Sequence, residues 1–319
     1  MKFGVTTFTR GPLATREGYH AIAAATEKAG FDFIAVNDHV VVPTSFDSKY
    51  PYNPEGKWSG AGEGFCFDQL ATLAFLASCT KRLQLLTAVM VVPHRHPVLA
   101  AKMLSTIDVL SQGRLLLGVG AGWLKEEFDI LGAPFAGRGR ATDEYIEAFK
   151  ELWSKDRPAY SGEFVKFDNV LFAPKPVRKD KVPIWVGGES GPAMRRTVKL
   201  GDVWYPGSNS RDPLLDTAER IGGAIAKLGG MAKAAGRDPA SIETAYSVQW
   251  PVSWTPERAA DGSRRLFTGS AADMAQDCAA LAKVGVSQAG MQLLASTVSE
   301  TCERIERFGK EVIAPAAKG

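Results

Sequence analysis

The strongest constraint on the fold is an eightfold alternation of short strand-forming runs with helical patterns. Most of these runs lack the apolar/polar alternation of a strand with one solvated face, so we expect both of their faces to be buried. The predicted strands cover residues 3–8, 31–36, 83–92, 114–119, 182–186, 202–205, 243–250 and 288–294. Buried strands that are each followed by a helix are typical of a parallel sheet.

Eight such units in 319 residues favour an α/β fold, a (β/α)8 TIM barrel with loop insertions. An open, doubly wound sheet is the alternative. No Pro/Ser-rich linker and no break in composition divides the chain, so we expect a single domain over residues 1–319. The long connections 37–66 and 251–270 follow strand ends, on what would be the catalytic face of a barrel. A third, 155–181, contains SGEFVKFDN, which is typical of a small hairpin.

Charge and cysteine content exclude several classes of protein. The chain carries 38 Lys and Arg against 35 Asp and Glu, a net charge of +3, with no basic block of the kind that binds nucleic acid. Its longest apolar run, Leu83 to Pro93, is too short to span a bilayer, and the N-terminus lacks the apolar core of a signal peptide. The four cysteines form no C-x-x-C pair. We therefore expect a cytoplasmic protein without a membrane or nucleic-acid partner.

A glycine-rich stretch, GRLLLGVGAGWLKEEF, covers residues 113–128. It fails the dinucleotide fingerprint because Trp123 and Lys125 stand where glycine is needed, and it lacks the G-K-[ST] of a P-loop. Two interpretations remain. Either backbone passes close to a flat or bulky group at this strand end, or the glycines serve tight packing against the next helix.

Residues 183–192, PIWVGGESGP, run from a buried strand into the start of a helix. Backbone N–H groups at a helix start can hold a phosphate, with the hydroxyl of Ser190 adding a donor. Later βα loops commonly form such a site in barrels. The alternative is a plain helix start that Ser190 caps.

Histidines offer two further sites. His39 follows the second strand, where it could act as an acid or base, or be an ordinary polar loop residue. His94 and His96 form an H-x-H pair, but prolines frame it and no acidic residue stands beside it. A turn is therefore favoured over a metal site, and no metal is predicted. An apolar substrate pocket is indicated by aromatic residues in or near the long loops, namely Trp58, Phe65, Trp123 and Trp250.

Taken together, these stretches resemble the luciferase-like monooxygenase superfamily over nearly the whole chain. The likeness is carried by Asn37-Asp38-His39, Thr87-Ala88-Val89 followed by HRHP, residues 113–128, RGRATDEYIEAFKELW, and PIWVGGESGPAMRRTVKLGDVWYP. It is greatest to the branch of oxidoreductases that depend on the deazaflavin coenzyme F420. The resemblance implies a (β/α)8 barrel that binds F420 or FMN at its C-terminal face.

The resemblance also implies roles for individual residues. A non-prolyl cis peptide between Ala88 and Val89 would back the cofactor ring, and Asp38 would contact the ring. His39 matches a proton-transfer histidine. The positions that flank the ring and the cofactor's side chain match Gly120, Ala121, Gly122 and Glu126, and the phosphate loop matches Gly187, Gly188, Glu189, Ser190 and Gly191.

One departure concerns the residue after Gly122. The sugar-phosphate dehydrogenases of this branch have a catalytic glutamate there, and this chain has Trp123. Their substrate is therefore not expected here, and Trp123 favours an apolar one. Arg264 and Arg265 could meet the acidic tail of F420 or be solvated surface.

The favoured function is hydride transfer between F420 and a small, apolar organic substrate. The first alternative is an FMN-dependent monooxygenase that uses O2 and reduced flavin from a separate reductase. The others are a flavin-binding barrel without catalytic activity and a metal-dependent hydrolase that uses His94 and His96. The resemblance further implies a homodimer.

Overall fold

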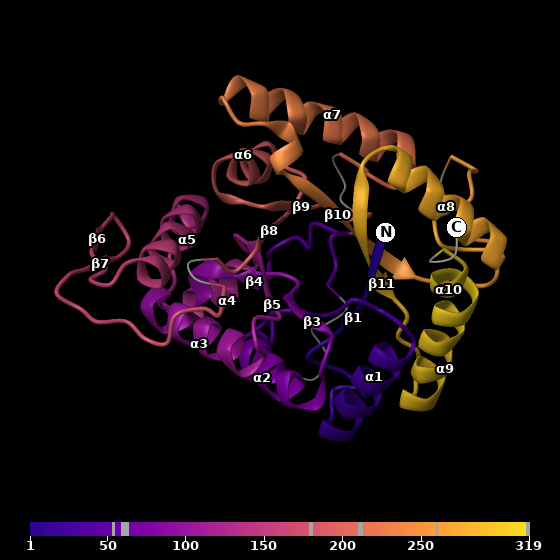
Figure 1. The fold of residues 1–319 in the computed structure, drawn as a ribbon, viewed down its shortest axis with the longest axis horizontal. Coiled ribbons are helices and arrows are strands. Elements are labelled where there is room, and N and C mark those ends of the chain that lie inside the picture. Colours follow the sequence, from indigo (N-terminus) through magenta and orange to yellow (C-terminus); the bar gives the residue numbers. More distant parts are fainter. Residues whose placement is uncertain (53–54, 59–63, 179–180, 210–212, 260, 317–319) are drawn as a thin grey trace.

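A closed barrel of parallel strands forms the centre of the molecule. The computed structural model describes residues 1–316 except 53–54, 59–63, 179–180, 210–212 and 260. The strand order is β3-β2-β1-β11-β10-β9-β8-β5-β4, and pairing of β3 with β5 closes the ring. Figure 1 shows the helices arranged around this ring. The predicted (β/α)8 barrel is thus confirmed over the open sheet.

The barrel strands are β1 (Lys2–Thr7), β2 (Phe33–Val36), β3 (Gln84–Thr87), β4 (Met90–Val91), β5 (Leu115–Gly120), β8 (Ile184–Gly187), β9 (Val203–Tyr205), β10 (Glu243–Pro251) and β11 (Val286–Gln292). The helices are α1 (Arg16–Lys28), α2 (Gln69–Cys79), α3 (Pro97–Leu110), α4 (Lys125–Leu131), α5 (Arg138–Ser154), α6 (Gly191–Leu200), α7 (Ala218–Ala234), α8 (Ala271–Lys283), α9 (Val298–Phe308) and α10 (Ala314–Ala316). The predicted hairpin is β6 (Tyr160–Ser161) paired with β7 (Lys166–Phe167), and it lies apart from the barrel (Figure 1).

Local sequence explains where many of these helices begin. A Ser, Thr or Asp side chain accepts a backbone hydrogen bond at the start of α1, α2, α6, α7, α8 and α9, through Thr15, Asp68, Ser190, Thr217, Ser270 and Thr297. Helix α7, for example, begins directly after Thr217, whose side chain accepts from the N–H of Arg220. None of the helices in the described part of the chain is both long and apolar enough to cross a bilayer.

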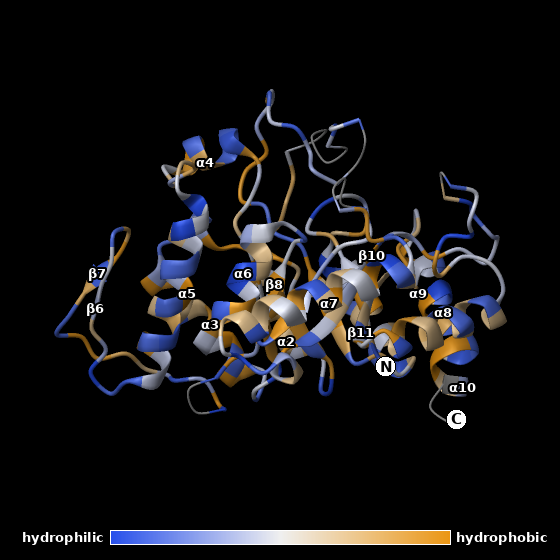
Figure 2. Ribbon diagram, turned by 90° about the horizontal axis from the view of Figure 1, so that it is seen from above, coloured by the Kyte–Doolittle hydropathy of each residue, from blue (hydrophilic) through white to orange (hydrophobic). Residues whose placement is uncertain are grey.

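Two apolar layers account for the missing alternation in the strands. One layer fills the barrel and consists of Phe33, Ala35, Leu86, Leu116, Trp185, Val203, Tyr205 and Ala245. The other lies between strands and helices and takes the intervening residues, such as Ile34 and Val36 of β2. Since side chains alternate along a strand, each strand needs apolar residues on both faces. Figure 2 shows hydrophilic and hydrophobic residues interspersed along the helices, as expected of helices that bury one face.

The predicted strand 83–92 is interrupted at its centre. It runs as β3 to Thr87, leaves the ladder at Ala88 and Val89, and resumes as β4. The peptide bond between Ala88 and Val89 is cis, as the resemblance implies. This bulge lies at the carboxyl ends of the strands, on the side where helix α4 rises above the barrel (Figure 2).

Gly118 is required by close packing of two neighbouring strands. A Cβ atom at this position would lie 1.9 Å from the carbonyl oxygen of Thr87. Because that oxygen belongs to the backbone of β3, it cannot move aside. We expect Gly118→Ala to lower the free energy of unfolding by about 1–3 kcal/mol, measured by urea denaturation.

The matched control for this substitution is Gly230→Ala in α7. Nothing lies within 4 Å of a Cβ atom at Gly230. Alanine there is expected to raise the free energy of unfolding by about 0.5–1 kcal/mol, because it reduces the freedom of the unfolded chain. Equal effects of the two substitutions would contradict the packing role of Gly118.

Candidate functional site

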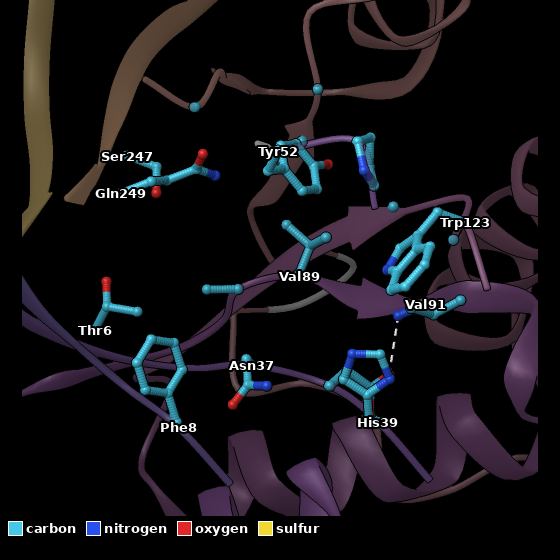
Figure 3. A pocket seen from close by; sticks show the side chains of 18 of the residues that line it. Thr6, Phe8, Asn37, His39, Tyr52, Val89, Val91, Trp123, Ser247 and Gln249 are labelled. Atoms are coloured by element: carbon cyan, nitrogen blue, oxygen red, sulfur yellow. Dashed lines mark hydrogen bonds between the residues drawn. The ribbon is translucent and has the colours of Figure 1, made fainter. Parts of the chain in front are cut away.

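A cavity of 1530 Å³ opens at the carboxyl ends of the barrel strands. Figure 3 shows His39 and Trp123 on one side of it, Thr6 and Phe8 on the other, and Val89 between them. This is the face on which barrel enzymes carry their active sites.

The bulge at Ala88–Val89 forms part of the cavity wall. Val89 projects between two glycines: a Cβ atom at Gly120 would lie 2.7 Å from Cγ2 of Val89, and one at Gly187 would lie 2.9 Å from Cγ1. Gly122 has a φ of 79° and lies against Phe128. These glycines therefore serve packing within the protein, while Gly120 and Gly122 also line the cavity with Ala121. The two interpretations of the glycine stretch are compatible.

His39 is held by a carboxylate that the sequence did not point to. Its Nδ1 lies 2.8 Å from Oε2 of Glu127, a fully buried residue of α4. Oε1 of Glu127 accepts hydrogen bonds from the backbone of Val40 and Val41. Burial alone would raise the pKa of Glu127, but the hydrogen bond from His39, the nearby imidazoles and the Val40 N–H outweigh it, so the pKa lies below the ordinary value. An ionised carboxylate only accepts, so Nδ1 carries the proton and Nε2 is left to exchange protons with a ligand.

Asp38 also lines the cavity, but its oxygens are bound within the protein. Its carboxylate accepts from both terminal nitrogens of Arg95 at 2.8 and 2.9 Å, and from the backbone N–H of Val91 at 2.9 Å. Arg95 also contacts Asp68, the cap of α2, at 2.6 Å. The side chain of Asp38 is completely buried. This cluster ties β4 to the end of β2, next to the bulge.

Aromatic rings cover the cavity beside His39. The ring of Trp58 lies 4.4 Å from that of His39 and 5.7 Å from that of Trp123, and Tyr50 packs edge-on against Trp123 at 5.2 Å. Phe65 lines the cavity at its rim and is 50% exposed. Trp58, Phe65 and Trp123 therefore lie where the predicted substrate pocket needs them.

Trp250 does not line this cavity, contrary to prediction. Its ring is buried in the layer between strands and helices, and its Nε1 donates to the carbonyl of Leu266 at 2.8 Å. The reason is the period of two along β10, which turns Ser247 and Gln249 toward the cavity and Trp250 away from it. Figure 3 shows these two polar residues in the cavity wall.

Glu126 also lies outside the cavity lining. Its Oε1 accepts hydrogen bonds from the backbone of Asp47 and Ser48, so it holds the long loop after β2 against α4. Successive residues of a helix point about 100° apart, so Glu127 rather than Glu126 reaches the site. Glu126 is thus not among the cavity-lining residues, and its contact with the cofactor stays a prediction.

The start of α6 forms another part of the cavity wall. Gly187, Gly188, Glu189 and Ser190 line it, whereas Gly191 is the first helical residue behind them. Ser190 caps α6 by accepting from Ala193 N–H, which confirms the cap interpretation without excluding a phosphate. Arg138 and Arg196 line the same region, and sequence reasoning did not identify either.

The remaining basic and metal candidates lie elsewhere. Arg264 forms an ion pair with Asp277 at 2.6 Å, Arg265 lies 3.4 Å from Glu257, and neither is among the cavity-lining residues. His94 is buried, with Nδ1 3.9 Å from Glu127, and burial lowers its pKa. His96 is exposed, so the pair diverges, as expected of a turn. Within the described residues, no group of three or more potential ligands could hold a metal ion.

Residues 1–302 match the family of luciferase-like monooxygenases. The chain belongs to this family. It is accordingly a flavin- or deazaflavin-dependent oxidoreductase, as the motifs at 37–39, 113–128 and 183–206 implied.

Relatives and solved structures represent both cofactors of the family. An uncharacterised protein of Mycobacterium tuberculosis is 33% identical over 196 residues, 61% of this chain and 67% of that protein. An FMNH(2)-dependent dimethylsulfone monooxygenase of Pseudomonas putida is 33% identical over 138 residues, 42% of this chain and 38% of its own length. The F420-dependent tetrahydromethanopterin reductase of Methanopyrus kandleri shares the fold, with a TM-score of 0.74, 17% identity and coverage of 98% of this chain and 99% of that one.

Proposed function

We propose that this protein transfers a hydride between coenzyme F420 and a small organic substrate with an apolar body, and that His39 exchanges the accompanying proton. The observation that supports this most is the buried pair of His39 and Glu127 beside Trp58 in the cavity. A positioned imidazole with one nitrogen held by a carboxylate is the usual arrangement for acid–base catalysis.

The cavity fits a flavin-type cofactor together with a substrate. Its 1530 Å³ exceeds the roughly 300–1,000 Å³ that one drug-sized ligand occupies. The first N–H groups of α6 and the guanidinium groups of Arg138 and Arg196 make one end suitable for a phosphate. We propose that this end binds the cofactor phosphate and that the wall formed by Ala88, Val89 and Gly120–Gly122 binds its ring.

The residues of the chain then have separate tasks. When bound, F420 supplies a carbon that gives or takes a hydride. His39 gives or takes the proton through Nε2, and Glu127 keeps the ring oriented and stabilises its protonated form. Trp58 and Trp123 exclude water from the reacting atoms.

Two observations favour FMN as the cofactor instead. The identity to the FMNH(2)-dependent dimethylsulfone monooxygenase extends over 42% of this chain. Arg264 and Arg265, which could have met the acidic tail of F420, do not line the cavity. The second candidate function is therefore monooxygenation with O2 and reduced FMN from a separate reductase.

Titration of the purified protein with F420 and with FMN distinguishes the two. We expect F420 to bind with a Kd at least about tenfold lower, a difference of about 1.4 kcal/mol, followed by ligand fluorescence. Tight FMN binding without F420 affinity would overturn the choice of cofactor. Arg138→Met should weaken binding, while Arg140→Met, an exposed arginine two residues away, should not. The implied homodimer stays a prediction, which light scattering would check.

A further inference from the structure

Arg10 lies in the wall of the cavity and is partly exposed. It follows β1, and its Cζ lies 4.7 Å from the ring centroid of Trp58 and 5.8 Å from that of Phe8. Its Nη1 is buried and has no hydrogen-bond partner among the described residues. Burial lowers the pKa of Arg10, although arginine stays protonated at neutral pH.

Three other arginines at or near the cavity have hydrogen-bond acceptors within the protein. Arg138 donates to the carbonyl of Gly122 at 3.1 Å, and Arg196 donates to that of Gly139 at 2.9 Å. Arg95 is enclosed by two carboxylates. A buried N–H donor without an acceptor is costly, so an acceptor that a ligand brings to the guanidinium of Arg10 would stabilise the complex.

The position of Arg10 identifies the kind of ligand. Trp58 contacts both Arg10 and His39, so a group bound by Arg10 lies near the proposed acid–base residue. The neighbouring rings of Phe8 and Trp58 favour an apolar body. The planar fork of one guanidinium matches a carboxylate, whereas the phosphate-type site lies at the start of α6.

We propose that Arg10 binds a carboxylate of the substrate and so holds the reacting carbon beside His39. The inference rests on the proposed function and narrows its substrate to a small carboxylic acid with an apolar body. Arg10 is then a residue that determines specificity through charge, beside the aromatic rings of Phe8 and Trp58.

A pair of probes tests this without knowledge of the natural substrate. Benzoate and benzamide have nearly the same shape and differ in charge, and quenching of tryptophan fluorescence reports their binding. With the full chain in the presence of F420, benzoate should bind at least about tenfold more tightly than benzamide. Arg10→Met should abolish this preference and Arg10→Lys should retain part of it. Arg16→Met, an exposed arginine outside the cavity, should leave the preference unchanged.

Three results would overturn the proposal. In the first, the wild-type protein binds both probes equally. In the second, Arg10→Met keeps the preference for benzoate. In the third, Arg10→Met weakens the binding of F420 and leaves the binding of both probes unchanged. Arg10 would then bind a carboxylate of the cofactor tail and not one of the substrate. Failure of the proposed function is a different result, namely that the wild-type protein binds neither F420 nor FMN.

Discussion

Replacing His39 by glutamine is expected to lower kcat by about 10²–10⁴-fold, the usual contribution of a general acid or base. The amide N–H of glutamine can still donate to Glu127, so the fold and the cavity should be retained. The amide cannot exchange a proton near neutral pH, so the hydride step loses its acid or base. Turnover is measured as the oxidation of reduced F420 by a panel of aldehydes and ketones.

Two comparisons separate the chemical role of His39 from a structural one. The affinity for F420 should stay within about twofold of the wild-type value in His39→Gln, because the phosphate end of the cavity is unchanged. His20→Ala removes an exposed histidine on α1 and should leave kcat unchanged. If His39→Gln turned over at the wild-type rate, the acid–base assignment would be wrong. A barrel that binds its cofactor tightly but reduces no member of the panel, even as wild type, would favour the carrier alternative.

Replacing Asp38 by alanine is expected to lower the free energy of unfolding by about 3–5 kcal/mol, because it leaves a buried guanidinium without its main partner. Both terminal nitrogens of Arg95 donate to Asp38, and the backbone N–H of Val91 does so too. The side chains of Asp38 and Arg95 are 0% and 9% exposed, so solvent compensates little. Urea denaturation measures the effect. F420 affinity should fall as well, because the bulge at Ala88–Val89 loses its tether.

Asp68 provides the matched control for this cluster. Its carboxylate also binds Arg95, but its side chain is 39% exposed, and it caps α2. Asp68→Ala should therefore cost about 1 kcal/mol, the usual value for a lost cap. Adding Arg95→Met to Asp38→Ala should recover part of the loss, because no buried charge then lacks a partner. A loss for Asp38→Ala no larger than that for Asp68→Ala would contradict the role of the buried pair.

Several features of the site could be anticipated and others could not. His39 and Ala88–Val89 stand in motifs, and the start of α6 stands in a recognisable glycine-rich turn. Glu127 was missed in favour of its neighbour, since a pair of adjacent glutamates does not show which one faces inward. Arg10 has no motif around it, and whether its Nη1 finds an acceptor depends on how distant segments pack around it; none of the described residues supplies one.

The barrel itself followed from the order of residues along the chain. Strand periodicity and capping residues are properties of short segments. The sequence alone therefore predicts eight buried strands with helices between them. The contacts of the site depend instead on residues far apart, such as His39 and Glu127, separated by 88 positions. Trp250 shows the same limit, because an aromatic residue at a strand end can face either side. Closure of the barrel determines which of these distant side chains come into contact, and no short stretch of the sequence indicates these contacts.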